Sequence, residues 1–256
     1  MSLIPPGFLN CVVAIGTKDS SDEMIWIGTG FLYGKYFQRI DIDEENNQYH
    51  IFLITNKHVL TGLDKIYVRF NPKNNENSED FKILLHKDKN ELIWKGHPDK
   101  EIDVAGILIN PNVLEKFKLK YAYFCSDKHV LFNEDLVSED LSEGDHIFVL
   151  GFPMGLVSEN RQYVICRNCC ISRISDFKEN RSKDFLIDAF VFPGNSGGPV
   201  ITKPEFISIE GTKPLKNARL IGMVQTYVPY RVLKLKNLES FLKKIQVYLQ
   251  LSQLNL

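Results

Sequence analysis

Short apolar segments, each followed by a polar turn sequence, limit the folds open to this chain more than any other feature. The segments are rich in Val, Ile, Phe and Tyr, residues that favour the extended backbone of a strand. Polar stretches such as 43–48 and 71–80 carry Asn, Asp and Pro, which favour turns and loops. Many short strands joined by turns are typical of a β-sandwich or β-barrel, so we expect an all-β fold.

The expected strands fall into two sets of nearly equal number. The first set is 11–16, 25–33, 50–55, 65–70, 81–85 and 103–109. The second set is 146–151, 162–174, 185–191, 198–202 and 219–228. The residues between the sets have a mixed, partly helical pattern and then an acidic stretch, which is typical of a connection between two domains.

We therefore predict an N-terminal β-domain over 1–115, a connection over 116–145 and a C-terminal β-domain over 146–235. After Pro229 the apolar residues take the spacing of one helix face, at Leu238, Phe241, Leu242, Ile245 and Leu249. An amphipathic helix is expected over 236–256. Packing on the second domain explains its apolar face better than a membrane does, because its polar face has few basic residues.

Charge and cysteine content exclude several classes of partner. Lys and Arg total 31 against 32 Asp and Glu, so no overall positive field favours nucleic acid or an anionic membrane. The N-terminal segment MSLIPPGFLN lacks the basic and long apolar regions of a secretory leader. Five scattered cysteines fit a reducing compartment better than a disulfide framework. We expect a cytoplasmic protein with free thiols, no membrane span and no nucleic-acid partner.

Three side chains could together perform nucleophilic catalysis. His58 lies just past an expected strand, Asp103 is the only ionisable residue at the start of another, and Ser196 lies in a glycine-rich turn between two more. Acyl transfer at neutral pH needs a hydroxyl activated by a base, and a carboxylate that holds the base in one tautomer. Singly, each residue is more often structural. Their occurrence together in the order His, Asp, Ser favours the catalytic interpretation.

The glycines around Ser196 support the same chemistry. Gly194, Gly197 and Gly198 have no Cβ, so they permit positive φ angles and a close approach of the backbone to a substrate oxygen. Acyl transfer also needs backbone N–H groups directed at the developing oxyanion.

At these residues the sequence resembles the chymotrypsin/trypsin-like serine peptidase superfamily, and most closely its high-temperature-requirement (Deg-type) branch. The resemblance covers most of the chain and rests on five motifs in order. They are GTGFL at 28–32, TNKHV at 55–59, DVAGILI at 103–109, GFPMG at 151–155 and GNSGGP at 194–199.

The resemblance implies two six-stranded antiparallel β-barrels with the catalytic residues in the cleft between them. Ser196 would be the nucleophile, His58 the general base and then acid, and Asp103 the residue that orients His58. The loop of Gly194, Asn195 and Ser196 would form the oxyanion hole through the N–H groups of Gly194 and Ser196. No cofactor and no metal would be needed.

Substrate-binding residues are also implied by the resemblance. The segment at 220–228 is similar to the strand that pairs with the substrate backbone, which would place Gln225, Thr226 and Tyr227 in the cleft. Phe190 occupies the position that lies at the base of the primary pocket in trypsin-like members. An aromatic residue there offers no partner to a basic side chain, so a preference for small or medium apolar side chains is expected.

Activation by proteolysis is not expected, because Asn195 stands where secreted digestive members carry the aspartate that pairs with a new N-terminus.

Two alternatives to a constitutively active peptidase stay open. The chain could instead be a latent or inactive peptide-binding module of the same fold, or need an activating protein partner. A zinc site at Cys166, Cys169 and Cys170 is disfavoured, because a strand would direct Cys169 away from the other two.

Overall fold

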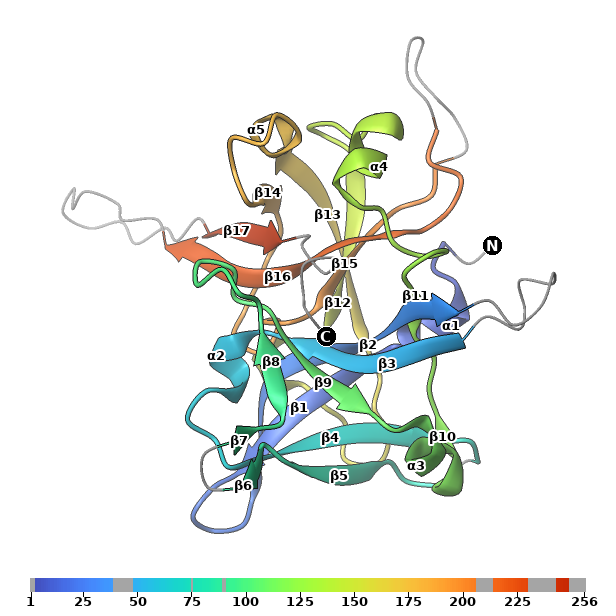
Figure 1. The fold of residues 1–256 in the computed structure, drawn as a ribbon, viewed down its shortest axis with the longest axis vertical. Coiled ribbons are helices and arrows are strands. Elements are labelled where there is room, and N and C mark those ends of the chain that lie inside the picture. The colour runs from blue at the N-terminus through green and yellow to red at the C-terminus, as the bar shows by residue number, and fades with distance from the viewer. Residues whose placement is uncertain are drawn as a thin grey trace.

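The chain forms two curled β-sheets that pack against each other, as the computed structural model in Figure 1 shows. The residues that the structure describes are 3–38, 48–74, 76–88, 91–205, 214–229 and 243–248. The first sheet is in the lower half of Figure 1 and the second in the upper half. The expectation of a fold dominated by strands is confirmed.

The first sheet has nine strands and takes almost all of its residues from the first half of the chain. Its strand order is β10-β4-β1-β2-β3-β9-β8, with β5 paired to β4 and β11 paired in parallel to β2. The strands are β1 (Val12–Lys18), β2 (Met24–Gln38), β3 (Gln48–Thr55), β4 (Lys65–Pro72), β5 (Glu79–Leu84), β8 (Trp94–Gly96), β9 (Ala105–Ile109), β10 (Leu119–Lys120) and β11 (Phe124–Cys125). A separate hairpin is formed by β6 (His86–Asp88) and β7 (Glu91–Leu92).

The second sheet has six strands that pair in a closed order, β12-β13-β14-β17-β16-β15. They are β12 (His146–Gly151), β13 (Ile165–Arg173), β14 (Phe185–Asp188), β15 (Pro199–Thr202), β16 (Leu220–Pro229) and β17 (Lys243–Tyr248). The first sheet is open in its strand order, so two equal closed barrels are not confirmed.

The helices are short and lie outside the sheets. They are α1 (Pro6–Leu9), α2 (Lys57–Leu60), α3 (Pro111–Lys116), α4 (Asn133–Ser138), α5 (Ser175–Lys178) and the 3-10 turn η2 (Pro153–Gly155). Over the described ranges, none of them has the length and apolar character that a membrane span requires.

The helix expected over 236–256 is wrong for Lys243–Tyr248, which form β17. This strand lies between two others and pairs antiparallel with both β14 and β16. Main-chain hydrogen bonds to two neighbours outweigh a local helical pattern, because tertiary pairing routinely overrides weak propensity. The rest of 236–256 lies outside the described residues.

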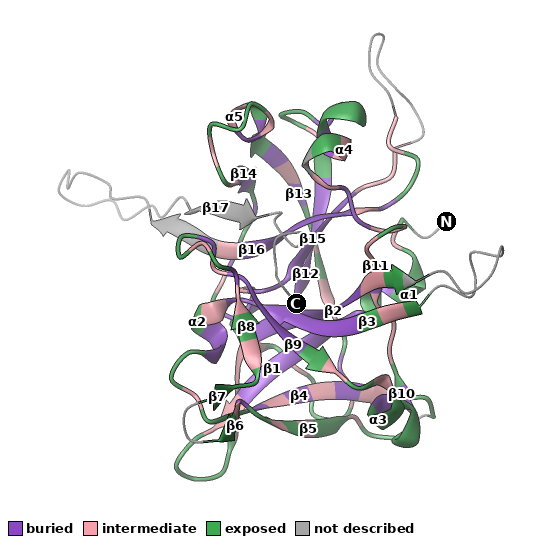
Figure 2. Ribbon diagram, in the orientation of Figure 1, coloured by how far each residue is buried: buried purple, intermediate pink, exposed green. Residues whose placement is uncertain are grey.

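A shared apolar core joins the two sheets. Phe31 from β2 and Phe124 from β11 pack in the same cluster as Phe148 from β12 and Leu220 from β16. The buried residues run along the central strands in Figure 2, while β5 presents mostly exposed residues. Side chains at this junction are therefore held by close packing against both sheets. The predicted connection is partly integrated as well, because β10 and β11 pair with the first sheet.

Glu143 gives the second sheet a pH-dependent contact. Its Oε1 accepts the N–H groups of Ile174, at 2.8 Å, and Ser175, at 2.9 Å, where α5 begins. These bonds lower the pKa of Glu143 from 4.5 to about 2. A carboxyl with a lowered pKa stabilises the fold above its ordinary pKa, and this contribution disappears as the pH falls toward 2.

We expect Glu143→Gln to lower the free energy of unfolding at pH 7 and to have little effect near pH 2. Urea unfolding of both proteins between pH 7 and pH 2 measures the difference. Glu139→Gln is the matched control, since Glu139 is exposed and among the described residues its carboxylate accepts no backbone N–H. A difference that stays constant across the pH range would contradict the expectation.

Candidate active site

His58 lies on a short helix that the end of β3 directs toward the junction of the sheets. Asn56 keeps an extended backbone between β3 and α2, and Val59 and Leu60 bury the opposite side of the helix. His58 is left with 52% of its side chain exposed. The helix is therefore anchored by apolar burial while its imidazole faces solvent.

Asp103 is placed beside His58 by the pairing of β3 with β9. Thr55 pairs with Ala105, so the residues just after β3 lie next to those just before β9. The side-chain amide of Asn56 donates to the Asp103 carbonyl at 2.7 Å, and the His58 N–H donates to Asp103 Oδ1 at 3.1 Å. His58 Nδ1 makes a short hydrogen bond to Asp103 Oδ2.

This contact determines the state of the imidazole. A carboxylate can only accept, so Nδ1 carries the proton and Nε2 keeps a free lone pair when the ring is neutral. Asp103 is 22% exposed, so the pair is shielded from water mainly on the carboxylate side. His58 is thus held as a base whose proton-accepting nitrogen is turned away from Asp103.

The loop that carries Asp103 is held by a residue of the second half of the chain, Lys183, which lies between α5 and β14. Lys183 Nζ contacts Asp99 Oδ2 and Glu101 Oε2, both at 2.6 Å. Its hydrogen bond lowers the pKa of the Asp99 carboxyl. Lys57 Nζ donates to the Asp99 carbonyl at 3.0 Å. The two contacts of Lys183 were not expected from the sequence, because their partners lie more than eighty positions away and no motif relates them.

Ser196 is half-buried in a loop whose carbonyl groups are almost all occupied. Pro193 O accepts from Met154 N at 2.6 Å, Gly194 O from Thr29 Oγ1 at 2.6 Å, and Ser196 O from Thr29 N at 2.9 Å. Asn195 O accepts from Gly198 N at 2.8 Å. The peptide planes of this loop are therefore fixed from several sides.

Two N–H groups of this loop, unlike its carbonyl groups, are left without a hydrogen-bond partner among the described residues. Asn195 N donates to Phe192 O at 3.1 Å, whereas the amides of Gly194 and Ser196 donate to no group in the described part of the chain. A trans peptide directs its C=O and N–H to opposite sides. Because Pro193 O and Asn195 O are bound within the protein, these two N–H groups face the other way and are available as a pair of donors.

The loop can take this shape only with glycine at two of its positions. Gly194 has φ +95° and Gly197 has φ +83°, in the left-handed region that L residues avoid. A Cβ on Gly197 would also collide with Thr29 O and Thr55 Oγ1, and one on Gly194 with Phe152 O. The glycine string around Ser196 is therefore a steric requirement of the loop.

Thr29 is a positioning residue that sequence reasoning did not single out. It is fully buried on β2, and its hydroxyl donates to Gly194 O while accepting Phe152 N at 3.1 Å. Its backbone N–H donates to Ser196 O, and its carbonyl accepts from Thr55 Oγ1 at 2.8 Å. One residue of the first sheet thus holds the Ser196 loop of the second. The only available signal was its place within GTGFL.

A cavity of about 200 Å³ brings His58 and Ser196 to one space. Its other lining residues are Ile27, Val191, Phe192, Pro193, Gly194 and Val224. Ser196 Oγ forms no hydrogen bond to His58 within the described residues. Such bonds are often long in unliganded sites and tighten when a substrate is bound. The cavity wall is apolar apart from the imidazole, the hydroxyl and the loop backbone.

The residues expected to bind substrate are placed differently from one another. Phe190 does not line this cavity and is 80% exposed, so its expected place at the base of a pocket is not supported. The two residues that follow it, Val191 and Phe192, line the cavity instead. Gln225 is half-buried, and its Oε1 has no partner in the described structure.

Thr226 and Tyr227 lie on β16, but their side chains are outside the described residues. The backbone of this strand is informative. β16 pairs with β15 only up to Met223, and Val224 exchanges two 2.9 Å hydrogen bonds with Gly197 and Gly198. Beyond Val224, no described strand pairs with the edge of β16 that faces the Ser196 loop. An extended peptide could add to that edge.

The cysteine cluster forms no metal centre in the described ranges, where no group of three His, Cys, Asp or Glu side chains converges. Cys169 is buried, and desolvation raises the pKa of its thiol to about 12. A thiol with a raised pKa stays protonated at neutral pH and is a poor nucleophile and metal ligand.

The site therefore assembles a hydroxyl, an oriented imidazole and two backbone donors that have no acceptor in the described ranges, all around one apolar cavity. These are the groups that acyl transfer requires. No model of a known protein family matches the chain, and no curated protein matches it at a significant level of similarity.

Proposed function

We propose that the chain is a serine endopeptidase that hydrolyses peptide bonds through an acyl-enzyme. The observation that carries this proposal is the His58–Asp103 contact beside a cavity that also contains Ser196 and two backbone amides with no acceptor among the described residues. The two curled sheets are compatible with a trypsin-like double barrel. Ser196 is the nucleophile, His58 the general base and acid, and Asp103 the orienting carboxylate.

In the acylation step, His58 Nε2 takes the proton of Ser196 Oγ as the oxygen attacks the substrate carbonyl carbon. A C–O bond forms, the carbonyl π electrons move to its oxygen, and the imidazole becomes a cation that Asp103 stabilises. The tetrahedral intermediate then collapses. The C–N bond breaks, and the departing amine receives the proton from His58 Nε2, which leaves an ester on Ser196.

Deacylation repeats these events with water as the nucleophile. His58 Nε2 removes a proton from the water, which attacks the ester carbonyl, and then returns that proton to Ser196 Oγ as the acid product leaves. In both steps the oxyanion is stabilised by the N–H groups of Gly194 and Ser196. Each such donor contributes a factor of about 100 or more to the rate.

Substrate is held as an extended strand on the open edge of β16. Main-chain hydrogen bonds to this edge would position the scissile carbonyl, and alternate side chains would enter pockets. The cavity beside Ser196 is small and is lined by Val191, Phe192 and Val224. We expect it to accept small or medium apolar side chains, because its described lining residues provide no carboxylate to a basic one.

A latent peptide-binding module is the competing function. A collapsed oxyanion loop would turn the Gly194 amide away from the cavity and point the Pro193 carbonyl into it. The hydrogen bond from Met154 N to Pro193 O supports the formed arrangement instead. It opposes the peptide rotation that collapse would need.

Labelling with a fluorophosphonate tests the proposal directly. The reagent should phosphonylate Ser196 in the native protein, as found by peptide mass analysis, and should fail after denaturation or in His58→Ala. A peptide library incubated with the native protein should yield defined cleavage sites. Failure of both labelling and cleavage would favour the latent module.

The Thr29 hydroxyl should matter through the loop that it positions. Thr29→Val preserves shape but leaves Gly194 O and Phe152 N without their partner, so the oxyanion donors lose their fixed placement. We expect kcat to fall about 10- to 100-fold. Complete loss of one oxyanion donor costs about 100- to 1,000-fold, and here the donors are displaced but still present. Thr29→Ser keeps the hydroxyl and should retain most of the activity. Equal losses in both variants would contradict a role of the hydrogen bond.

A further inference from the structure

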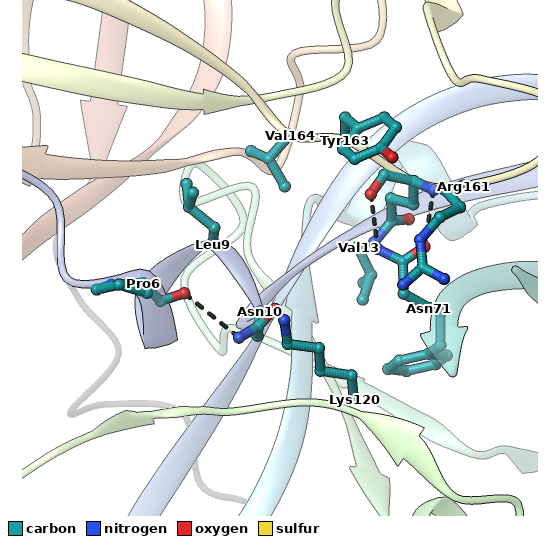
Figure 3. Close-up of a pocket in the computed structure, with 11 residues that line it drawn as sticks. Pro6, Leu9, Asn10, Val13, Asn71, Lys120, Arg161, Tyr163 and Val164 are labelled. Carbon is teal, nitrogen blue, oxygen red and sulfur yellow. Dashed lines mark hydrogen bonds between the residues drawn. The ribbon is translucent and has the colours of Figure 1, made fainter. Parts of the chain in front are cut away.

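A second cavity, of about 300 Å³, shares no lining residue with the one beside Ser196. It lies where α1, β1, β4 and β10 of the first half meet the segment that precedes β13 (Figure 3). Ligand pockets have volumes of roughly 300–1,000 Å³, so this cavity is large enough for a small ligand.

The walls of the cavity are fixed by hydrogen bonds that join the two halves of the protein. Gln162 is buried, and its side chain accepts Ala14 N at 3.0 Å and donates to Val12 O at 3.1 Å. These two bonds to the backbone of β1 resemble those that a paired strand would make. The Asn71 side chain pairs with the Gln162 backbone through bonds of 2.7 and 2.8 Å. These bonds hold the part of the wall that Asn71 and Gln162 form.

The charge of the cavity is one-sided. Among the described lining residues, Lys120 and Arg161 are the only ionised side chains, and no carboxylate accompanies them. Lys120 has no hydrogen-bond or ion-pair partner within the described part of the chain, and Figure 3 shows its side chain extending toward that of Asn10. Pairing of β10 with β4 places Lys120 opposite Asn71, whose side chain is already engaged.

Arg161 adds a second cation with donors to spare. One of its terminal nitrogens donates to Asn74 O at 3.1 Å and to Glu76 O at 2.8 Å. The remaining guanidinium nitrogens have no partner in the described residues. A planar guanidinium with free donors suits a carboxylate. The bonds to the two carbonyls also explain why Arg161 is held at the pocket.

The rest of the lining is apolar. Val13 and Phe70 are buried beneath the opening, and Leu9, at 37% exposure, and Val164 flank it. A fully hydrated inorganic anion would leave this surface uncovered. A ligand with an apolar body would cover it and place its charge beside Lys120.

We propose that this cavity binds a small carboxylate with an apolar body, either a free organic acid or the C-terminal carboxylate of a peptide that ends in an apolar residue. The charged end contacts Lys120 and Arg161, and the apolar end packs on Leu9 and Val164, above the buried Val13 and Phe70. This site does not depend on the proposed peptidase activity, since none of its residues takes part in that chemistry.

Titration of the full-length ¹⁵N-labelled protein tests the proposal. The probes are 4-phenylbutyrate and acetyl-Gly-Leu, followed by the side-chain amide signals of Asn71 and Gln162. We expect saturable shifts with a Kd on the order of 1 mM for at least one probe. The stronger of the two probes identifies the source of the carboxylate. Absence of saturable shifts for both would overturn the proposal.

Charge and site are tested separately. 4-Phenylbutanamide, the neutral analogue, should bind about tenfold more weakly, and so should 4-phenylbutyrate to Lys120→Met. Lys120→Arg should retain binding, and Lys116→Met, on exposed α3 outside the pocket, is the matched control. Equal binding of the amide, unchanged binding in Lys120→Met, or displacement by inorganic phosphate at equal ionic strength would overturn it. Labelling of Ser196 is read independently, so the two proposals can fail separately.

Discussion

Ser196→Ala is expected to lower kcat by about 10⁵- to 10⁶-fold, while the fold and its stability stay almost unchanged. The hydroxyl is the nucleophile of the proposed reaction, and loss of this group in a Ser-His-Asp site removes nearly all of the rate enhancement. Stability should be preserved because Ser196 Oγ makes no hydrogen bond within the described structure. Steady-state cleavage of a peptide from the library and thermal unfolding measure the two effects.

Cooperation between the catalytic residues gives a stricter test of the same result. If Ser196 and His58 act as one unit, Ser196→Ala combined with His58→Ala should be no slower than Ser196→Ala alone. Additive losses would mean that the two side chains act in separate steps. Activity that survives Ser196→Ala would show that another residue, or a contaminating protease, performs the cleavage.

Asp103→Asn should produce the second-largest loss, about 10⁴-fold in kcat. The asparagine amide would donate to His58 Nδ1, which forces the ring proton onto Nε2. The imidazole then cannot accept the proton of Ser196 Oγ, although it stays in place. Its backbone contact can persist, because an asparagine oxygen still accepts the His58 N–H that Asp103 Oδ1 accepts at 3.1 Å.

A matched variant separates this effect from general loss of charge near the loop. Asp99→Asn removes a carboxylate four positions away that contacts Lys183 and not His58. We expect it to lower activity far less than Asp103→Asn, through loosening of the loop alone. Steady-state kcat of both variants, measured on the same peptide, distinguishes the two effects. Similar losses in both variants would remove the special role given to Asp103.

Much of the strand pattern was predictable, because strands leave a local signature of apolar and β-branched residues. The expected strand at 146–151 coincides with β12, and that at 198–202 contains β15. The C-terminal helix failed for Lys243–Tyr248, where Ile245, Gln246 and Val247 also fit an alternating pattern. Two short-range patterns competed there, and pairing with β14 and β16, which are distant in sequence, decided the outcome.

The residues of the candidate site were likewise predictable only in part. The side chains that could carry the chemistry were visible in sequence, since a histidine, an aspartate and a serine in glycine-rich surroundings have few other common uses together. Thr29 and Lys183 were not visible, because their roles are contacts with distant backbone and carboxylate groups. Phe190 was placed at the base of a pocket only by its distance from Ser196 along the chain. In the structure its side chain is exposed to solvent, because the backbone of the loop before Ser196 directs it outward.

The sequence by itself determined which segments extend, which turns need glycine and which functional groups are present, because these depend on residues close together along the chain. Only the tertiary structure decided that His58 meets Asp103 through the β3–β9 pairing, and that the amides of Gly194 and Ser196 find no acceptor in the part of the chain that the structure describes. The same holds for the cationic pocket at Lys120 and Arg161. Proximity and unsatisfied hydrogen bonds arise from long-range packing, which no local pattern encodes.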